Sequence, residues 1–126
     1  MSPPPLPQPR RGQIWYARFP GDPAGKNARP VVIVSADRRN AHPRAPTVLA
    51  VPLSTTLTDF PLHIRLQPGE TGLREISELQ PQNISVITKD SLLPNPGARM
   101  LSERILRIIA RNVVKSMGIQ PADIQD

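Results

Sequence analysis

The apolar run at residues 30–34, Pro-Val-Val-Ile-Val, constrains the fold of this chain more than any other stretch. Successive side chains of a strand point to opposite faces of a sheet, so a strand that is apolar at every position must be covered on both faces. Arg29 stands directly before this run. The sequence therefore predicts a central strand, buried on both sides, with a guanidinium at its entrance.

Other segments have the composition of short strands, and one has that of a helix. The predicted strands are 13–19, 30–35, 47–53 and 60–66, with one or two more between 76 and 87, interrupted at Pro81. The strand at 47–53 must end near Pro52, because proline cannot donate a hydrogen bond to a neighbouring strand. Residues 101–118 place apolar side chains along one stripe at helical spacing, with Ser102 as the N-cap and Gly118 as the stop. Residues 36–46 are polar and basic, which favours a surface loop.

The segment 60–66 alternates cleanly between apolar and polar side chains. This alternation predicts that Phe60 and Leu66 lie on a core face, whereas His63 and Arg65 lie on a wet face. An imidazole has a suitable pKa for a general base, of about 6.5 when unperturbed. We nevertheless expect a solvated or ligand-facing His63 rather than a catalytic one.

Short strands followed by a packing helix predict an α+β fold, a small and mostly antiparallel barrel or half-barrel. The 126 residues suffice for one domain. Residues 1–11 hold five of the seventeen prolines, which favours a disordered tail. We therefore expect a domain at 12–119, with a short C-terminal tail at 120–126.

The composition excludes several kinds of chemistry. The chain has no cysteine and two histidines, which excludes disulfides, thiolate nucleophiles and zinc clusters, and we expect no metal or other cofactor. No run reaches the roughly 18 apolar residues of a membrane-spanning helix, and the N-terminus lacks the apolar centre of a signal peptide. These features predict a soluble, cytoplasmic protein that does not bind membranes.

The charge of the chain favours an anionic polymer as partner. The formal net charge is +6, the pI is about 11.1, and thirteen of the sixteen basic residues are arginine. A guanidinium presents a planar fork that matches phosphate oxygens. Aromatic residues make up 3% of the chain, which argues against an RNA-binding sheet that depends on rows of stacking rings.

The order of the motifs resembles the MazF/PemK family, the toxins of type II toxin-antitoxin systems. The motifs are RRGQIWYARF, RPVVIVS, TVLAVPLS and GLREIS before the final helix, and the resemblance covers about residues 10 to 119. It implies an SH3-like barrel, also found in CcdB, and a homodimer. It further implies an endoribonuclease that cuts single-stranded RNA without metal, by attack of the 2′-hydroxyl on its own phosphate to leave a cyclic phosphate. An antitoxin with an acidic, initially disordered segment would be the protein partner.

The resemblance implies that Arg29 and Ser54 are the catalytic residues. A guanidinium can stabilise the charge that develops on nonbridging phosphate oxygens with two directed hydrogen bonds. Pro30 biases Arg29 toward extended backbone and holds it at a stiff strand entrance. A serine hydroxyl is a weak acid or base without a tuning neighbour, so we expect Ser54 to position the phosphate.

Further residues are expected to contact RNA. Many relatives carry an acidic residue in the loop before Arg-Pro, whereas PAGKNA carries a lysine here. The segment SELQPQ at 77–82 matches the family at its serine and has glutamines at approximate family positions. The loop at 36–46, after the central strand, is basic. The expected substrate-binding residues are Lys26, Ser77, Gln80, Gln82, Arg38 and Arg39.

Two other functions fit the same sequence. A noncatalytic toxin resembling CcdB would inhibit DNA gyrase by protein contact, and the altered polar positions between Gln80 and Thr88 favour that alternative. A basic module that binds RNA for regulation, without cleaving it, would also account for the charge. A supercoiling assay and a search for RNA products would distinguish the three functions.

Overall fold

The computed structural model describes residues 6–19, 21–25 and 27–124. In chain order the elements are β1 (Ile14–Ala17), β2 (Arg29–Ile33), α1 (Asp37–Asn40), β3 (Thr47–Ser54), β4 (Ile64–Leu66), α2 (Pro68–Thr71), β5 (Ser77–Leu79), the 3-10 turn η1 (Pro81–Asn83), β6 (Ser85–Thr88), η2 (Lys89–Ser91), α3 (Glu103–Ser116) and η3 (Pro121–Asp123).

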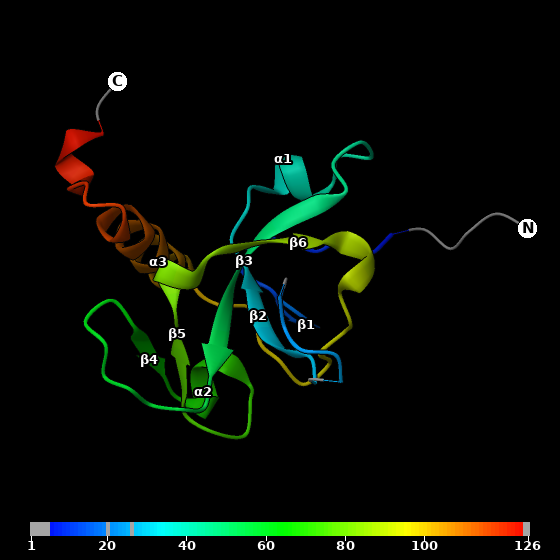
Figure 1. Ribbon diagram of the computed structural model, residues 1–126, viewed down its shortest axis with the longest axis horizontal. Coiled ribbons are helices and arrows are strands. Elements are labelled where there is room, and N and C mark those ends of the chain that lie inside the picture. Colours follow the sequence, from blue (N-terminus) through cyan, green and yellow to red (C-terminus); the bar gives the residue numbers. More distant parts are fainter. Residues whose placement is uncertain (1–5, 20, 26, 125–126) are drawn as a thin grey trace, which may run out of the picture.

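The strands form one antiparallel sheet in the order β1-β2-β3-β5-β4, and β6 pairs with β3. Figure 1 shows β3 running through the middle of the molecule, with β6 beside its first half, β5 beside its end, and β4 on the far side of β5. The predicted α+β fold with a C-terminal helix is confirmed. The predicted barrel is not closed among the described strands, because the end strands β1 and β4 do not pair with each other.

Both faces of the central strands are buried, as the apolar run predicts. Val31, Val32 and Ile33 of β2 have no exposed surface. Val32 belongs to the core under α3, whereas Val31 and Ile33 belong to a second core on the other face with Phe19. A strand covered on both sides holds its ends firmly, so the position of Arg29 at the start of β2 is fixed by the core.

The helix α3 begins and ends as the sequence predicts. The Ser102 hydroxyl accepts a hydrogen bond from the Ile105 amide at 3.3 Å, and Gly118 has a positive φ of 79° just past the helix. Ile105, Leu106 and Ile109 are buried against the sheet. No helix in the described part of the chain is long and apolar enough to cross a membrane.

Two local predictions are wrong. The strand predicted at 60–66 begins only at Ile64, as β4. Residues 60–63 form a loop outside the sheet, so Phe60 is 50% exposed. The loop predicted at 36–46 contains the short helix α1, since the Asn40 side chain is buried and hydrogen-bonds both Ser35 and Asp37.

The division into two tails and a domain stays a prediction, and residues 1–5 lie outside the described part. Within the predicted N-terminal tail, Arg11 contacts the domain twice. Its amide donates to Asp37 and its guanidinium donates to Glu103, both at 2.7 Å. These contacts connect the start of the chain to α1 and α3.

Candidate functional site

A cavity of about 400 Å³ opens beside the first residue of β2. Its walls come from the loop after β1, from β2, from β3 and from the segment around η1. The lining residues are Phe19, Asp22, Arg29, Pro52, Gln80, Gln82, Asn83, Ile84 and Ser85. The cavity therefore combines one cationic, one anionic and several amide side chains.

The Arg29 guanidinium is held on two sides in this cavity. Its Nη2 donates to Asp22 Oδ1 at 3.3 Å, and its Cζ lies 4.4 Å from the centre of the Phe19 ring. Its Nε is buried and has no hydrogen-bond partner among the described residues. A flat cation that is stacked on a ring, and that keeps a buried donor unpaired, is prepared to bind an anion.

A row of polar residues continues across the sheet from this cavity. Antiparallel pairing places Ser54 of β3 opposite Glu78 of β5, and Glu78 opposite Arg65 of β4. Residues that face each other across strands share one face of the sheet, and Ser54 shares its face with Pro52, which lines the cavity. The Arg29 cavity and the Ser54–Glu78–Arg65 row therefore lie on the same face.

Glu78 is a buried carboxylate at the centre of this row. Its side chain is 2% exposed, and it accepts hydrogen bonds from the Thr58 amide and hydroxyl, the Asp59 amide, His63 and Arg65. The Thr58 amide, followed by the His63 and Arg65 side chains, lowers the pKa of Glu78 from 4.5 to about 2, against the opposing effect of burial. Glu78 is therefore an anion that binds protons poorly.

His63 connects this carboxylate to the Arg29 cavity. Its Nδ1 lies 3.0 Å from Glu78 Oε1, and its Nε2 lies 2.6 Å from Nε2 of Gln82, which lines the cavity. The His63 side chain is 7% exposed, so of the two expected states, solvated or ligand-facing, the solvated one is wrong. The alternation of the segment placed it on the same side as Arg65, but the loop at 58–59 and Glu78 cover that side.

The described residues contain no group of three or more His, Asp and Glu side chains arranged to hold a metal ion. The site can instead bind an anion at the guanidinium and polar groups at the glutamines. Such a combination suits a phosphate with its attached sugar or base.

Comparison with known proteins places this chain in a family. Residues 10–117 match the family of PemK-like, MazF-like toxins of type II toxin-antitoxin systems. The chain belongs to this family. The match favours the MazF-like interpretation of the sequence over the CcdB-like one.

Proteins similar to this MazF-like chain include endoribonucleases. It is 33% identical over 92 residues to the endoribonuclease MazF9 of Mycobacterium tuberculosis, which covers 67% of this chain and 76% of that protein. A mycobacterial endoribonuclease in complex with its cognate antitoxin is 25% identical, with a TM-score of 0.66 and coverage of 89% and 95%. A second mycobacterial endoribonuclease has the same fold, with 24% identity, a TM-score of 0.69 and coverage of 90% and 95%.

The structure brings together only some of the residues that the MazF-like motifs predicted. Arg29, Gln80 and Gln82 line one cavity. Ser54 lies on the same face of the sheet but is not among the lining residues described for that cavity. Its hydroxyl accepts a hydrogen bond from the Thr56 amide at 3.1 Å. Ser77 is buried and lines a different cavity, of about 340 Å³, together with Pro30.

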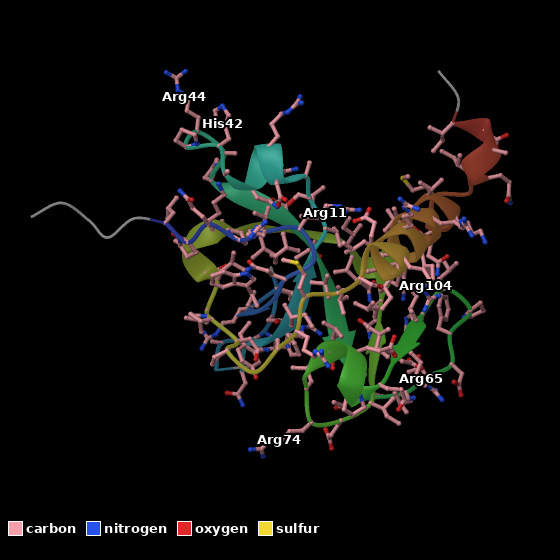
Figure 2. All side chains as sticks on the ribbon, turned by 180° about the vertical axis from the view of Figure 1, so that it is seen from behind. Arg11, His42, Arg44, Arg65, Arg74 and Arg104 are labelled. Atoms are coloured by element: carbon pink, nitrogen blue, oxygen red, sulfur yellow. The ribbon has the colours of Figure 1, made fainter. Side chains whose placement is uncertain are left out.

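The predicted basic contacts lie elsewhere. Arg38 and Arg39 belong to α1, and Arg39 donates to Thr47 at the start of β3. That position is about 17 Å along β3 from Pro52, at about 3.3 Å per residue. Figure 2 shows His42 and Arg44 at the α1 end of the molecule, with Arg65 and Arg74 at the opposite end. Lys26 lies outside the described residues.

The sequence analysis missed three residues of the site. Asp22 supplies the acidic partner of Arg29, but the family pattern predicts an acidic residue within PAGKNA, whereas Asp22 precedes that segment. Glu78 and the buried state of His63 were also missed. A lone glutamate in a short strand gives no signal in the sequence, because its partners come from the separate segment 58–65, which ends in β4.

Proposed function

We propose that this protein is the toxin of a type II toxin-antitoxin system and that it is an endoribonuclease for single-stranded RNA. The observation that carries the proposal is the Arg29 guanidinium, stacked on Phe19 with its buried Nε unpaired, in a cavity with two glutamines. Family membership and an endoribonuclease relative that is 33% identical support the reaction class.

The reaction is an internal transfer of the phosphodiester. The 2′-hydroxyl oxygen attacks the adjacent phosphorus, the bond from phosphorus to the 5′-oxygen breaks, and the products are a 2′,3′-cyclic phosphate and a 5′-hydroxyl. Arg29 binds the nonbridging oxygens, on which negative charge develops in the transition state. The reaction needs no metal in this scheme, because the guanidinium supplies the positive charge.

Two protons must move during the transfer. The 2′-hydroxyl loses a proton as it attacks, and the departing 5′-oxygen gains one from solvent. Asp22 lines the cavity beside Arg29, so its carboxylate is placed to take the first proton. Glu78 is unsuited to this role, since it is not among the residues that line this cavity and its pKa is about 2.

The remaining residues have smaller parts in the proposed function. Ser54 positions the substrate on the shared face of the sheet, and the other predicted contacts, Lys26, Ser77, Arg38 and Arg39, touch RNA outside the cavity. The protein acts as a homodimer in the cytoplasm. An antitoxin with an acidic segment inhibits it by competing for the arginines, in keeping with a relative whose structure includes its cognate antitoxin.

Mapping the ends of RNA fragments tests this proposal. The protein is incubated with single-stranded RNA in excess chelator, and we expect 2′,3′-cyclic phosphate and 5′-hydroxyl ends. A 2′-deoxy nucleotide at the cut site should abolish cleavage there. Arg104→Ala, which alters an exposed arginine on α3 (Figure 2), is the matched control and should cleave normally. If the RNA stays intact, or is bound without being cleaved, the proposed endoribonuclease activity is refuted.

A further inference from the structure

The hydrogen-bonded chain Glu78–His63–Gln82 leads from a buried carboxylate to the wall of the Arg29 cavity. Glu78 is ionised and can only accept hydrogen bonds, because its pKa is about 2. His63 Nδ1 lies 3.0 Å from Glu78 Oε1 and 3.1 Å from the Thr58 hydroxyl. A hydrogen bond to the carboxylate at this distance requires that Nδ1 carries the proton.

The position of that proton fixes the orientation of Gln82. A neutral imidazole with its proton on Nδ1 has a bare Nε2, which is an acceptor. Beside this neutral form of His63, the Gln82 amide turns its nitrogen toward the imidazole and donates at 2.6 Å. The opposite orientation would place two acceptors against each other.

The other end of the amide is left without a partner. Gln82 Oε1 is buried and accepts no hydrogen bond from any described residue, and Arg29 Nε, in the wall of the same cavity, is a buried donor that is also unpaired. Buried polar atoms are almost always paired, since an unmade hydrogen bond is costly. The residues that line the cavity thus hold one unpaired acceptor and one unpaired donor, which the matching groups of a ligand would satisfy.

We propose that Gln82 Oε1 accepts a hydrogen bond from a donor group of RNA next to the phosphate held by Arg29. In this proposal His63 and Glu78 are positioning residues, which keep the acceptor end of the amide turned toward the substrate. The identity of the ligand rests on the proposed function. The donor is either the ribose 2′-hydroxyl or an N–H group of a base, and both place a polar hydrogen near the phosphate.

The position of the imidazole proton can be measured without any variant. Nitrogen-15 NMR of the labelled protein at mildly alkaline pH distinguishes a protonated Nδ1 from a protonated Nε2. His42 is an internal reference of the opposite kind, because its Nδ1 accepts a hydrogen bond from the Arg44 amide and its proton therefore belongs on Nε2. We expect His63 to carry its proton on Nδ1, and a proton on Nε2 would overturn the proposal.

Binding measurements identify the donor. Single-stranded oligonucleotides with 2′-amino groups keep a donor but resist cleavage, whereas 2′-fluoro groups cannot donate. If the 2′-hydroxyl is the donor, the wild-type protein binds the 2′-amino probe about tenfold more tightly and Gln82→Ala binds both equally. If a base N–H is the donor, the wild-type protein binds both equally but prefers particular bases, and Gln82→Ala loses that preference. A Gln82→Ala protein that binds every probe as the wild type does would overturn the proposal.

A variant of His63 tests the positioning role. His63→Asn keeps a donor toward Glu78 but removes the acceptor that holds the Gln82 nitrogen, so the same selectivity should decline while the melting temperature changes little. His42→Asn is the matched control and should keep full selectivity. Unchanged selectivity in a folded His63→Asn protein would contradict the role of His63. Since these assays measure proton position and binding, they remain informative if RNA is not cleaved, and failure of cleavage alone would count only against the proposed function.

Discussion

Replacing Arg29 with lysine separates the charge of the guanidinium from its shape. The structure gives the guanidinium three relations: a contact with Asp22 at 3.3 Å, a stack on Phe19 at 4.4 Å, and a buried Nε without a partner. A lysine ammonium has the same charge on a single atom. It can keep the contact with Asp22 or approach the phosphate, but it cannot present two directed donors from a flat group.

The expected loss follows from the hydrogen bond that lysine cannot make. A hydrogen bond to a charged group contributes about 1.5–3 kcal/mol. In the transition state this corresponds to a decrease in kcat of roughly ten- to a hundredfold. Arg29→Ala removes all donors and should cost about a hundred- to a thousandfold, as does removal of an oxyanion-hole donor. Ser54→Ala should cost less than about tenfold, because that hydroxyl is bonded to the Thr56 amide and is worth one neutral hydrogen bond.

Single-turnover cleavage of a labelled RNA in chelator measures these rates, with thermal unfolding of each variant as the control for folding. The order wild type, Ser54→Ala, Arg29→Lys, Arg29→Ala is the expected result. A lysine variant as fast as the wild type would show that charge alone suffices and would refute the argument from geometry. An alanine variant with normal activity would remove Arg29 from the reaction altogether.

Three further predictions concern neighbouring residues. Asp22→Asn should bind the uncleavable 2′-fluoro probe up to about fivefold more tightly, because the phosphate no longer competes with a carboxylate for Arg29. The same variant should cleave RNA at least about a hundredfold more slowly, because the general base is lost. Equal effects on binding and on rate would contradict the role of Asp22 as a base. Ser102→Ala should lower the free energy of unfolding in urea by about 1 kcal/mol without changing cleavage, because it removes the N-cap of α3. The pKa of Glu78 lies below its ordinary value in the folded protein, so the unfolded chain binds that proton first on acidification. The stability from Glu78 is therefore complete above pH 4.5 and is lost as the pH falls toward about 2, and urea unfolding of Glu78→Gln should depend less on pH across this window.

Local patterns accounted for the parts of the fold that depend on neighbours in the sequence. The apolar run at 30–34 predicted a strand buried on both faces, and Val31 to Ile33 are fully buried. Ser102 and Gly118 predicted the ends of α3 correctly. These signals succeed because alternation, helical spacing and capping each act over a few residues.

The structure brings together the predicted site residues that follow from one strand entrance and one turn, while their roles stay a prediction. Arg29, Gln80 and Gln82 line the same cavity. The basic residues Arg38 and Arg39 lie at the other end of β3, because an excess of arginine in a sequence carries no information on where each guanidinium lies.

The sequence by itself determined the order of the elements, the buried central strand and the presence of a guanidinium at its entrance. Only the tertiary structure decided which groups surround that guanidinium. The pairing of β3 with β5 and of β5 with β4 places Glu78 beside Ser54 and Arg65, and the loop at 58–63 then buries His63 between Glu78 and Gln82. These contacts join residues 15 and 19 positions apart in the chain, a separation at which short-range patterns carry no signal. The chemical character of the cavity, with its amides and its unpaired donor, is therefore a property of the folded sheet.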